Sequence, residues 1–227
     1  MPKVLVGCPT CDIYNYCLND YINVVKNLTY GNYDVVLVDN SKTDEYANKL
    51  INLGFKVLKD TYRDDARERI MSSRNILKDY MLDNGYDYLL SLEQDVIPPA
   101  DIIERLLSYN KMIVSATYFN YVKWKGSDIL VPLLLIGKNP NDFKARYMQI
   151  DKLSPARLTE VKACGLGCVL IHRDVLDKIE FRYEKDKKGF DDVWFCADSK
   201  KLGFEIFADT GILCKHLIKN KPWRWNP

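Results

Sequence analysis

Short apolar runs alternate with amphipathic stretches through the first hundred residues of the chain. The runs are nearly continuous, which is typical of strands that are buried on both faces of a sheet. Between them, apolar residues recur at helical spacing, and Gly85 follows the longest such stretch as a stop signal. The pattern predicts strands at 3–9, 33–41, 55–60 and 86–93, and helices at 19–28, 44–53 and 65–83.

This alternation predicts an α/β fold with a Rossmann-like, mostly parallel central sheet that is flanked by helices. The second half is less regular: Pro98 and Pro99 predict the start of a helix that ends at Leu107, and residues 119–160 allow no assignment. No repeat, low-complexity tract or linker interrupts the chain, so we expect one domain over residues 1–227. Further elements are predicted as a strand at 111–119, a glycine-rich turn, strand and short helix over 161–179, a helix at 191–203, a strand at 204–209 and a segment at 211–217.

The charge balance gives no reason to expect nucleic acid as the main partner, because 33 basic and 31 acidic residues leave a net charge of +2. The sequence begins with a strand-like run rather than a secretory signal, and no apolar run approaches the length of a membrane span. We therefore expect a cytoplasmic protein. The basic, aromatic segment 219–227 predicts a lid over a ligand, a peripheral contact with the inner membrane surface, or a packed or disordered tail.

Seven cysteines are many for a cytosolic chain. Cys8 and Cys11 form a CxxC with Cys17 close by, but no second CxxC or paired histidines complete a zinc site. We therefore expect reduced and mostly buried cysteines.

The polar residues at the carboxyl ends of the strands are the candidates for a site, because ligands bind there in parallel sheets. Glu93 and Asp95 flank Gln94, and in an extended segment residues i and i+2 point to the same side. Two converging carboxylates suit Mg²⁺ or Mn²⁺ bound together with a diphosphate. A solvated loop with two ordinary acids is the alternative. The three candidate groups are Thr10 to Asp12, Asp39 to Ser41, and Glu93 to Asp95.

Two other segments carry possible nucleotide contacts. Asp39 ends a strand, where its carboxylate is able to accept hydrogen bonds from a base or ribose, although an Asx-type turn is equally consistent. Arg74 and Asn75 lie in the predicted helix 65–83, and an arginine near a diphosphate would help to neutralise it. The alternative for Arg74 is an ordinary charged helix face.

The glycines of "CGLGC" do not spell GxGxxG, because Leu170 occupies the third glycine position, and this argues against a Rossmann oxidoreductase. Gly165 and Gly167 instead predict a close approach of the backbone to a ligand, or a tight turn. His172, inside an apolar run, is expected to be a strand residue.

The last candidates are acidic residues at a helix start and one histidine. Asp191 and Asp192 open a helix, so capping is the default role, but the pair also allows one acid to serve as a general base. His216 is either structural or a third ligand of a metal site begun by Glu93 and Asp95.

Taken in order, five stretches resemble the nucleotide-sugar-dependent glycosyltransferases of GT-A fold, and most closely the family 2 type. The resemblance implies that Asp39 contacts the nucleotide and that Asp95 binds the metal that bridges the diphosphate. Glu93 stands where the family's first aspartate stands, so its metal contact is expected through water. The stretches are "VVLVDNSKTD", "SSRNILKDYML", "YLLSLEQDVIPP", "ACGLGCVLIHRDVLDKI" and "FDDVWFCADSKKLGFEIFAD".

The same resemblance implies roles for the remaining candidates. Asp192, or its neighbour Asp191 in a DD pair that replaces the family's ED, would deprotonate the acceptor hydroxyl, and His216 would be an extra metal ligand. Residues 1–97 would bind the nucleotide sugar and residues 98–227 the acceptor. The predicted set for nucleotide and cofactor is Thr10, Asp12, Asp39, Arg74, Asn75 and Gln94.

The implied activity is metal-dependent, inverting transfer of a sugar from a nucleoside diphosphate to a hydroxyl of a glycan, lipid-linked or protein acceptor. A sugar-phosphate nucleotidyltransferase is one alternative, but "GCPTCDIYN" lacks the glycine-rich basic signature that such enzymes carry after their first strand. A catalytically silent module that binds nucleotide sugars is the other.

Overall fold

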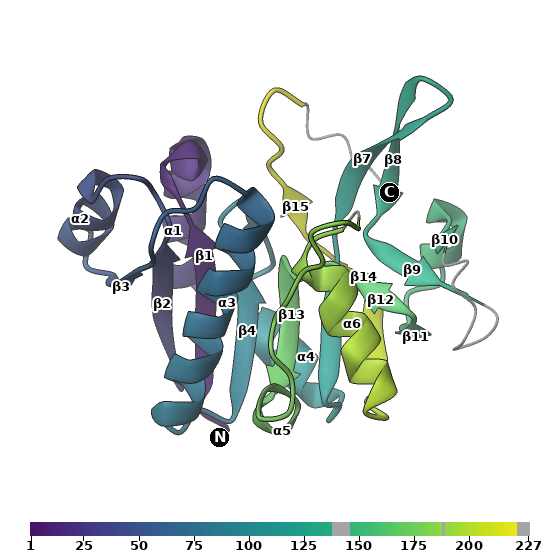
Figure 1. Ribbon diagram of the computed structural model, residues 1–227. Coiled ribbons are helices and arrows are strands. Elements are labelled where there is room, and N and C mark those ends of the chain that lie inside the picture. Colours follow the sequence, from purple (N-terminus) through teal and green to yellow (C-terminus); the bar gives the residue numbers. More distant parts are fainter. Residues whose placement is uncertain (138–145, 188, 222–227) are drawn as a thin grey trace.

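The computed structural model describes residues 1–137, 146–187 and 189–221 (Figure 1). Its centre is an eight-stranded sheet in which only β13 and β11 run against the other strands, so the predicted mostly parallel sheet is confirmed. The strands in spatial order are β11 (Leu158–Val161), β14 (Ile206–Leu213), β6 (Ile113–Thr117), β13 (Cys168–His172), β4 (Tyr88–Leu92), β1 (Val4–Thr10), β2 (Tyr33–Asp39) and β3 (Lys56–Lys59).

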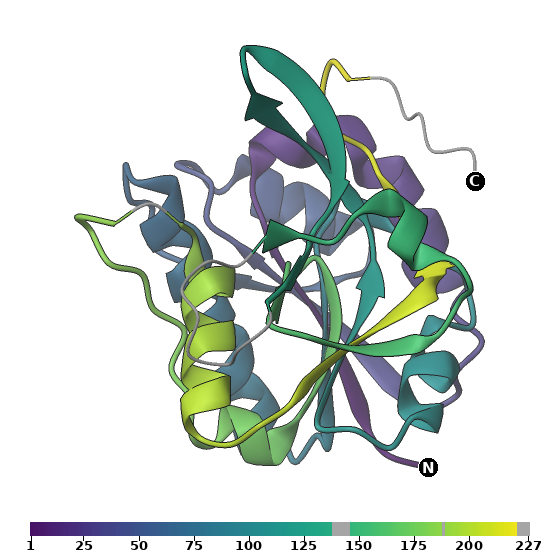
Figure 2. The same cartoon turned by 90° about the vertical axis from the view of Figure 1, so that its right-hand side faces the viewer.

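Helices cover both faces of the sheet, and Figure 2 shows the two helix layers with the sheet between them. On one side lie α3 (Ala66–Asp83), α5 (Arg173–Leu176) and α6 (Asp191–Lys201), and on the other α1 (Leu18–Lys26), α2 (Glu45–Asn52) and α4 (Ile102–Ser108). Side chains alternate along β1, so Val4 and Val6 enter one core and Leu5 the other. Gly7 lets α3 approach the sheet, because a Cβ there would lie 3.1 Å from the Leu77 side chain of that helix.

Every strand and helix predicted for residues 1–97 is present, with boundaries shifted by a few residues. The helix predicted from Pro98 begins instead at Ile102, because the two prolines lie in a turn in which the Ile102 amide donates to the Pro99 carbonyl. The predicted strand at 204–209 continues as β14 to Leu213, with a register irregularity after Asp209.

The segment that the sequence left unassigned forms small sheets beside the main one. One of these small sheets is the hairpin β7–β8, and in the other β9 pairs with β10 and β12. Their bounds, with those of the single-turn η2, are β7 (Phe119–Trp124), β8 (Ser127–Pro132), β9 (Leu134–Ile136), β10 (Arg146–Tyr147), η2 (Ile150–Leu153) and β12 (Ala163–Cys164).

Near the end of the chain, β15 (Lys215–His216) pairs antiparallel with β5 (Val96–Ile97), directly after the acidic triplet. All seven cysteines are free and buried, which confirms that prediction. No helix among residues 1–137, 146–187 and 189–221 is long and apolar enough to cross a membrane. Most of the predicted basic, aromatic tail, residues 222–227, lies outside the described residues.

Candidate active site

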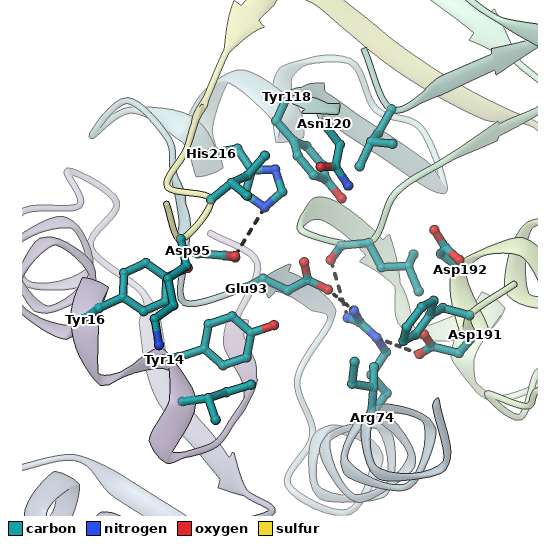
Figure 3. A pocket seen from close by; sticks show the side chains of 17 residues that line it. Tyr14, Tyr16, Arg74, Glu93, Asp95, Tyr118, Asn120, Asp191, Asp192 and His216 are labelled. Carbon is teal, nitrogen blue, oxygen red and sulfur yellow. Dashed lines mark hydrogen bonds and ion pairs between the residues drawn. The ribbon is translucent and has the colours of Figure 1, made fainter. Parts of the chain in front are cut away.

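A cavity of about 580 Å³ lies beyond the carboxyl ends of β1, β4 and β6 (Figure 3). The 3-10 helix η1 (Asp12–Cys17), which follows β1, forms one wall, and the start of α6 forms the opposite one. The structure therefore brings together side chains from segments that lie far apart in the chain. The predicted site residues that line this cavity are Arg74, Glu93, Asp95, Asp191, Asp192 and His216.

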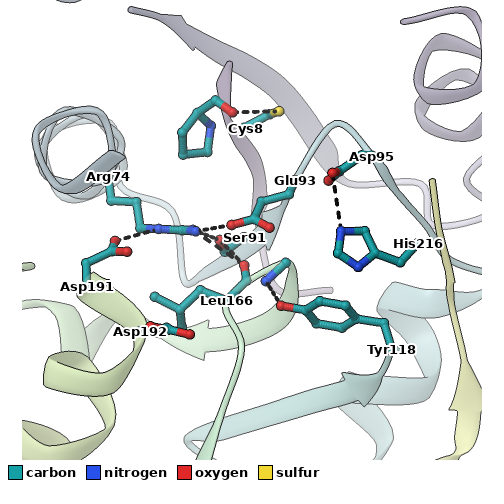
Figure 4. A network of polar contacts seen from close by, with 12 residues as sticks. Cys8, Arg74, Ser91, Glu93, Asp95, Tyr118, Leu166, Asp191, Asp192 and His216 are labelled. Carbon is teal, nitrogen blue, oxygen red and sulfur yellow. Dashed lines mark hydrogen bonds and ion pairs between the residues drawn. The ribbon is translucent and has the colours of Figure 1, made fainter. Parts of the chain in front are cut away.

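Arg74 is the buried centre of a polar network that joins these segments (Figure 4). One terminal nitrogen donates to Glu93, and the other donates to the Ser91 hydroxyl at 2.6 Å and to the Leu166 carbonyl at 3.4 Å. Its Nε lies 2.7 Å from Oδ2 of Asp191, as an ion pair without hydrogen-bond geometry. Burial alone would lower the pKa of Arg74, but the charges of Asp191 and Glu93 raise it, so the guanidinium stays charged.

The two carboxylates beside Arg74, those of Glu93 and Asp191, have a structural role in this network. Burial raises the pKa of Glu93 and of Asp191, while Arg74 opposes the rise in both. Removing the guanidinium would leave two uncompensated carboxylates in a buried site, which is strongly unfavourable. Arg74 therefore ties α3, the end of β4 and the start of α6 to one another, and its charge is already matched by two acids.

Asp95 and His216 form a second pair on the other side of the cavity. Nε2 of His216 lies 3.2 Å from Oδ2 of Asp95, and Nδ1 lies 2.7 Å from the Phe119 carbonyl. A hydrogen bond from the Leu217 amide to the Asp95 carbonyl, at 2.7 Å, reinforces the pairing of β15 with β5. The Tyr118 ring meets the imidazole edge-on, with centroids 5.4 Å apart.

The protonation of His216 follows from its neighbours. A carbonyl only accepts, so Nδ1 carries a hydrogen that it donates to Phe119, and Nε2 of the neutral ring turns a lone pair toward Asp95. Two acceptors in contact repel each other unless a proton or a cation lies between them. Burial lowers the pKa of His216, but the hydrogen bond and the charge of Asp95 outweigh it and raise that pKa.

This arrangement fits a divalent cation. A carboxylate oxygen and an imidazole nitrogen that face each other suit Mn²⁺, and the Nδ1–H bond to a carbonyl is the support that metal-binding histidines usually have. Within the described part of the chain, no group of three or more His, Cys, Asp or Glu side chains is placed to hold a metal. Glu93 is directed to Arg74 instead, so the residues that fit a metal are Asp95 and His216.

Asp192 faces the cavity without a basic partner within ion-pair distance among the described residues. Its Oδ1 accepts from the Val193 amide at 2.8 Å, at the start of α6. Burial and the charge of Asp191 raise the pKa of Asp192 to about 6. Figure 3 shows Asp191 turned toward Arg74 and Asp192 turned away from it, so the adjacent acids have different surroundings.

The glycines of "CGLGC" lie at a turn, which was one of the two expectations for them, and they make room there for a tyrosine. A Cβ on Gly165 would lie 2.1 Å from the Tyr118 hydroxyl, and one on Gly167 would lie 2.8 Å from the same ring. The Gly167 amide donates to that hydroxyl at 2.8 Å. Tyr118 thereby holds this turn and, through its ring, the position of His216.

The other predicted residues do not reach the large cavity. Thr10 and Gln94 line a neighbouring cavity of about 60 Å³, where the Thr10 hydroxyl donates to the Gln94 side chain and the Gln94 amide donates to the Tyr14 carbonyl at 2.7 Å. Gln94 is thus a buried link between the ends of β1 and β4 and η1.

Asp12, Asp39 and Asn75 line neither cavity. The Asp39 carboxylate is buried and accepts from Ser41 and, at 2.7 Å, from Lys59. The Asn75 amide both donates to and accepts from the Phe181 backbone. In this structure the hydrogen bonds of both side chains serve the fold.

Several residues of the cavity were missed from the sequence. They are aromatic or apolar side chains, and an asparagine, on segments without a recognisable motif. The run "DIYNY" after β1 was the one available signal, because a polar and aromatic segment at the end of a parallel strand is well placed to meet a ligand. The missed residues with polar or aromatic side chains are Tyr14, Tyr16, Tyr118, Asn120 and Phe190. Lys219, which also lines the cavity, belongs to the segment 219–227 for which a lid was one of the predictions.

Neither a protein-family model nor a curated protein matches the sequence, whereas several solved structures are similar to it. The chain is similar to A197 from STIV, with a TM-score of 0.52, 18% identity, and coverage of 96% of this chain and 86% of that one. It is also similar to the mannosyltransferase PcManGT from Pyrobaculum calidifontis in complex with GDP-Man and Mn²⁺, with a TM-score of 0.61, 14% identity, and coverage of 98% and 59%.

A third similar structure is GalNAc-T7 with UDP, GalNAc and Mn²⁺, with a TM-score of 0.66, 14% identity, and coverage of 99% of this chain and 45% of that chain. The chain therefore spans about half the length of the two glycosyltransferase structures. At these identities the likeness concerns the fold, and the chain has the GT-A fold.

Proposed function

We propose that this protein is a metal-dependent glycosyltransferase that moves a sugar from a nucleoside diphosphate to an acceptor hydroxyl, with inversion at the anomeric carbon. One observation carries the proposal: the Asp95–His216 pair and Asp192 face a single cavity from opposite sides. A metal-bound diphosphate on the first side and an attacking hydroxyl on the second would approach the anomeric carbon from opposite directions.

The charges around the cavity support a cation in the donor site. Four carboxylates line the cavity, whereas Arg74 and Lys219 are its basic residues apart from His216. Arg74 is matched by two of those acids, so a diphosphate would meet an excess of negative charge. A bound Mn²⁺ or Mg²⁺ would reverse that balance and supply Lewis-acid stabilisation of the leaving diphosphate. Asp95 and His216 would hold it, and Lys219 would add positive charge from the C-terminal segment.

Asp192 would act as the general base. A base must be ionised near neutral pH and within hydrogen-bond reach of the hydroxyl that it activates. A pKa of about 6 meets the first condition, and the position of Asp192 on the cavity wall supports the second. Direct attack by the activated hydroxyl displaces the diphosphate and inverts the anomeric carbon. Asp191 would position this helix start through Arg74.

The proposal keeps the predicted division of the chain, with residues 1–97 for the donor and residues 98–227 for the acceptor, except that His216 and Lys219 would serve the donor. The solved neighbours support this class of donor, since one contains GDP-Man and another UDP, both with Mn²⁺. Which base and sugar this chain accepts, and whether the acceptor is a glycan, a lipid-linked sugar or a protein, depends on the loops around the cavity.

A binding and turnover panel tests the proposal. Thermal unfolding is measured with nucleoside diphosphates and their sugars, with and without Mn²⁺, and release of nucleoside diphosphate is measured in the same mixtures. We expect one base series to stabilise the protein when Mn²⁺ is present, and slow hydrolysis of its sugar conjugate. Binding without release, even with a range of acceptors, would identify a silent module. Release of pyrophosphate from a nucleoside triphosphate and a sugar phosphate would identify a nucleotidyltransferase.

A further inference from the structure

The hairpin β7–β8 projects from the domain (Figures 1 and 2), and Asn120 on β7 lines the cavity. Its strands pair from Phe119 opposite Pro132 to Trp124 opposite Ser127. Lys125 and Gly126 form the turn with φ angles of 48° and 84°, the left-handed values that a tight two-residue hairpin turn requires. A two-stranded hairpin buries little surface of its own, so its side chains are free to serve contacts with other groups.

One face of the hairpin is occupied by the C-terminal segment. Residues that lie directly opposite in a hairpin share a face, so Tyr121 and Leu130 point the same way as Lys123 and Asp128. Asp128 forms ion pairs with Lys123 at 2.8 Å and with Lys221 at 2.6 Å. The Lys221 ammonium also lies 5.3 Å from the centre of the Tyr121 ring. The outer end of this face is polar and binds Lys221, whereas its inner end carries the buried Phe119 opposite Pro132.

The opposite face is apolar between its polar ends, and it begins at the cavity wall with Asn120. It carries Asn120, Val122 and Trp124 on β7, opposite Val131, Ile129 and Ser127 on β8. Asn120 lines the cavity, Trp124 is 62% exposed, and Ile129 is 38% exposed. Four residues of extended chain separate Asn120 from Trp124, a distance of about 13 Å. An apolar strip of that length therefore leads outward from the cavity wall.

Exposed apolar surface of this kind usually marks a binding site. The position of the strip indicates what binds to it. Because the strip begins at Asn120 on the cavity wall, its occupant would be part of a molecule that also enters the cavity. The side chains of Val122 and Ile129 offer no hydrogen bonds, so an extended glycan would lose hydration there without compensation. An aliphatic chain loses nothing polar and gains from burial against valine, isoleucine and tryptophan.

We infer that this strip binds an aliphatic group of the acceptor, attached to the sugar or other polar head whose hydroxyl reaches Asp192. The inference rests on the proposed glycosyl transfer and adds the acceptor class: amphiphilic molecules rather than free glycans or protein side chains. A nucleoside diphosphate sugar has no aliphatic part, so the donor is not the occupant.

Alkyl glucosides of increasing chain length test the inference. Binding of methyl, butyl, hexyl and octyl β-glucoside is measured by calorimetry, below the concentration at which they form micelles. We expect the dissociation constant to fall by about two- to fourfold for each added methylene that the strip covers. Trp124→Ser and Ile129→Ser should flatten this dependence. The matched control Lys123→Ser changes the opposite face and should leave the dependence as in the unmodified protein.

Two results would overturn the inference: an affinity that does not depend on chain length, or a dependence that survives both Trp124→Ser and Ile129→Ser. Binding of the hairpin to phosphatidylglycerol vesicles with no chain-length effect would also overturn it, in favour of a membrane contact. Thermal unfolding of each variant checks that the hairpin change leaves the domain folded. Donor binding with Mn²⁺ is recorded in the same samples, so loss of the proposed function and loss of the strip's role are separate outcomes.

Discussion

Nε2 of His216 lies 3.2 Å from Oδ2 of Asp95, although 121 positions separate the two residues in the sequence. The contact exists because β15 pairs with β5, which follows directly after the acidic triplet. Nδ1 of His216 donates its hydrogen to the Phe119 carbonyl, so Nε2 of the neutral ring has a lone pair. That lone pair faces the Asp95 carboxylate across a gap that a proton or a metal ion is able to bridge. The candidate metal site is a product of this long-range pairing.

Removing either member of that pair should weaken Mn²⁺ binding. We expect His216→Ala and Asp95→Asn each to raise the dissociation constant by at least about tenfold, since even outer-shell partners of metal ligands contribute that much. Titration calorimetry or the loss of the free Mn²⁺ resonance signal measures the effect. Asp12→Asn, a change of an exposed acid outside both cavities, is the control. Equal affinity in all three variants would contradict the assignment.

Asp192→Asn should abolish transfer while donor binding remains. A general base contributes about 10²–10⁴-fold to the rate, so kcat should fall by that factor with little change in the affinity for the donor and Mn²⁺. Asp191→Asn is the matched control, because its carboxylate pairs with Arg74 and its loss should mainly lower the unfolding temperature. Undiminished turnover by Asp192→Asn would show that another group accepts the proton.

The activity should rise with pH through about 6. Burial and the charge of Asp191 raise the pKa of Asp192 to about 6, and the base works only when it is ionised. Below this pKa, kcat/KM should therefore fall by about tenfold per pH unit, and above it the profile should level. Each measurement uses saturating Mn²⁺, because protons compete with Mn²⁺ for Nε2 of His216. A profile without an inflection near 6 would contradict the role of Asp192.

Arg74→Met should destabilise the fold. The change leaves Glu93 and Asp191 in a buried site without their cation, which costs about 3–5 kcal/mol of unfolding free energy when such a pair is broken. Denaturant unfolding measures the loss. Arg67→Met on the same helix is the control, because its pairing with Asp65 is at the surface and its loss should change little. Similar results for both arginines would mean that the network around Arg74 does not stabilise the fold.

The local sequence pattern was sufficient for the parallel half of the sheet. Apolar runs and helical spacing depend on neighbours within a few residues, and so the strands and helices of residues 1–97 were predicted. The segment 119–160 was not, because its short strands β7 to β11 have little periodicity and are stabilised by pairing with one another and with β14. The start of α4 was predicted at Pro98 but lies at Ile102. The local pattern was ambiguous there, because two adjacent prolines fit a turn as well as the first turn of a helix.

Residue types alone were a weaker guide to the site. Carboxylates at the ends of strands pointed to the right edge of the sheet, and six of the predicted residues line the cavity there. The pattern was unable to show that Asp39 pairs with Lys59 or that Asn75 binds the Phe181 backbone. Both partners are distant in sequence, and a side chain's hydrogen bonds depend on what the fold brings beside it.

By itself, the sequence determined the α/β architecture and the edge of the sheet that carries the polar groups, and its family resemblance favoured Asp95 over Glu93 as a metal ligand. Only the tertiary structure decided that Glu93 and Asp191 pair with Arg74. Asp95 is therefore free to pair with His216, and Asp192 faces the cavity. Periodicity records which face of an element is buried. Which charges meet depends on the packing of α3, α6 and β15 around the sheet, and that packing is set by contacts far apart in the chain.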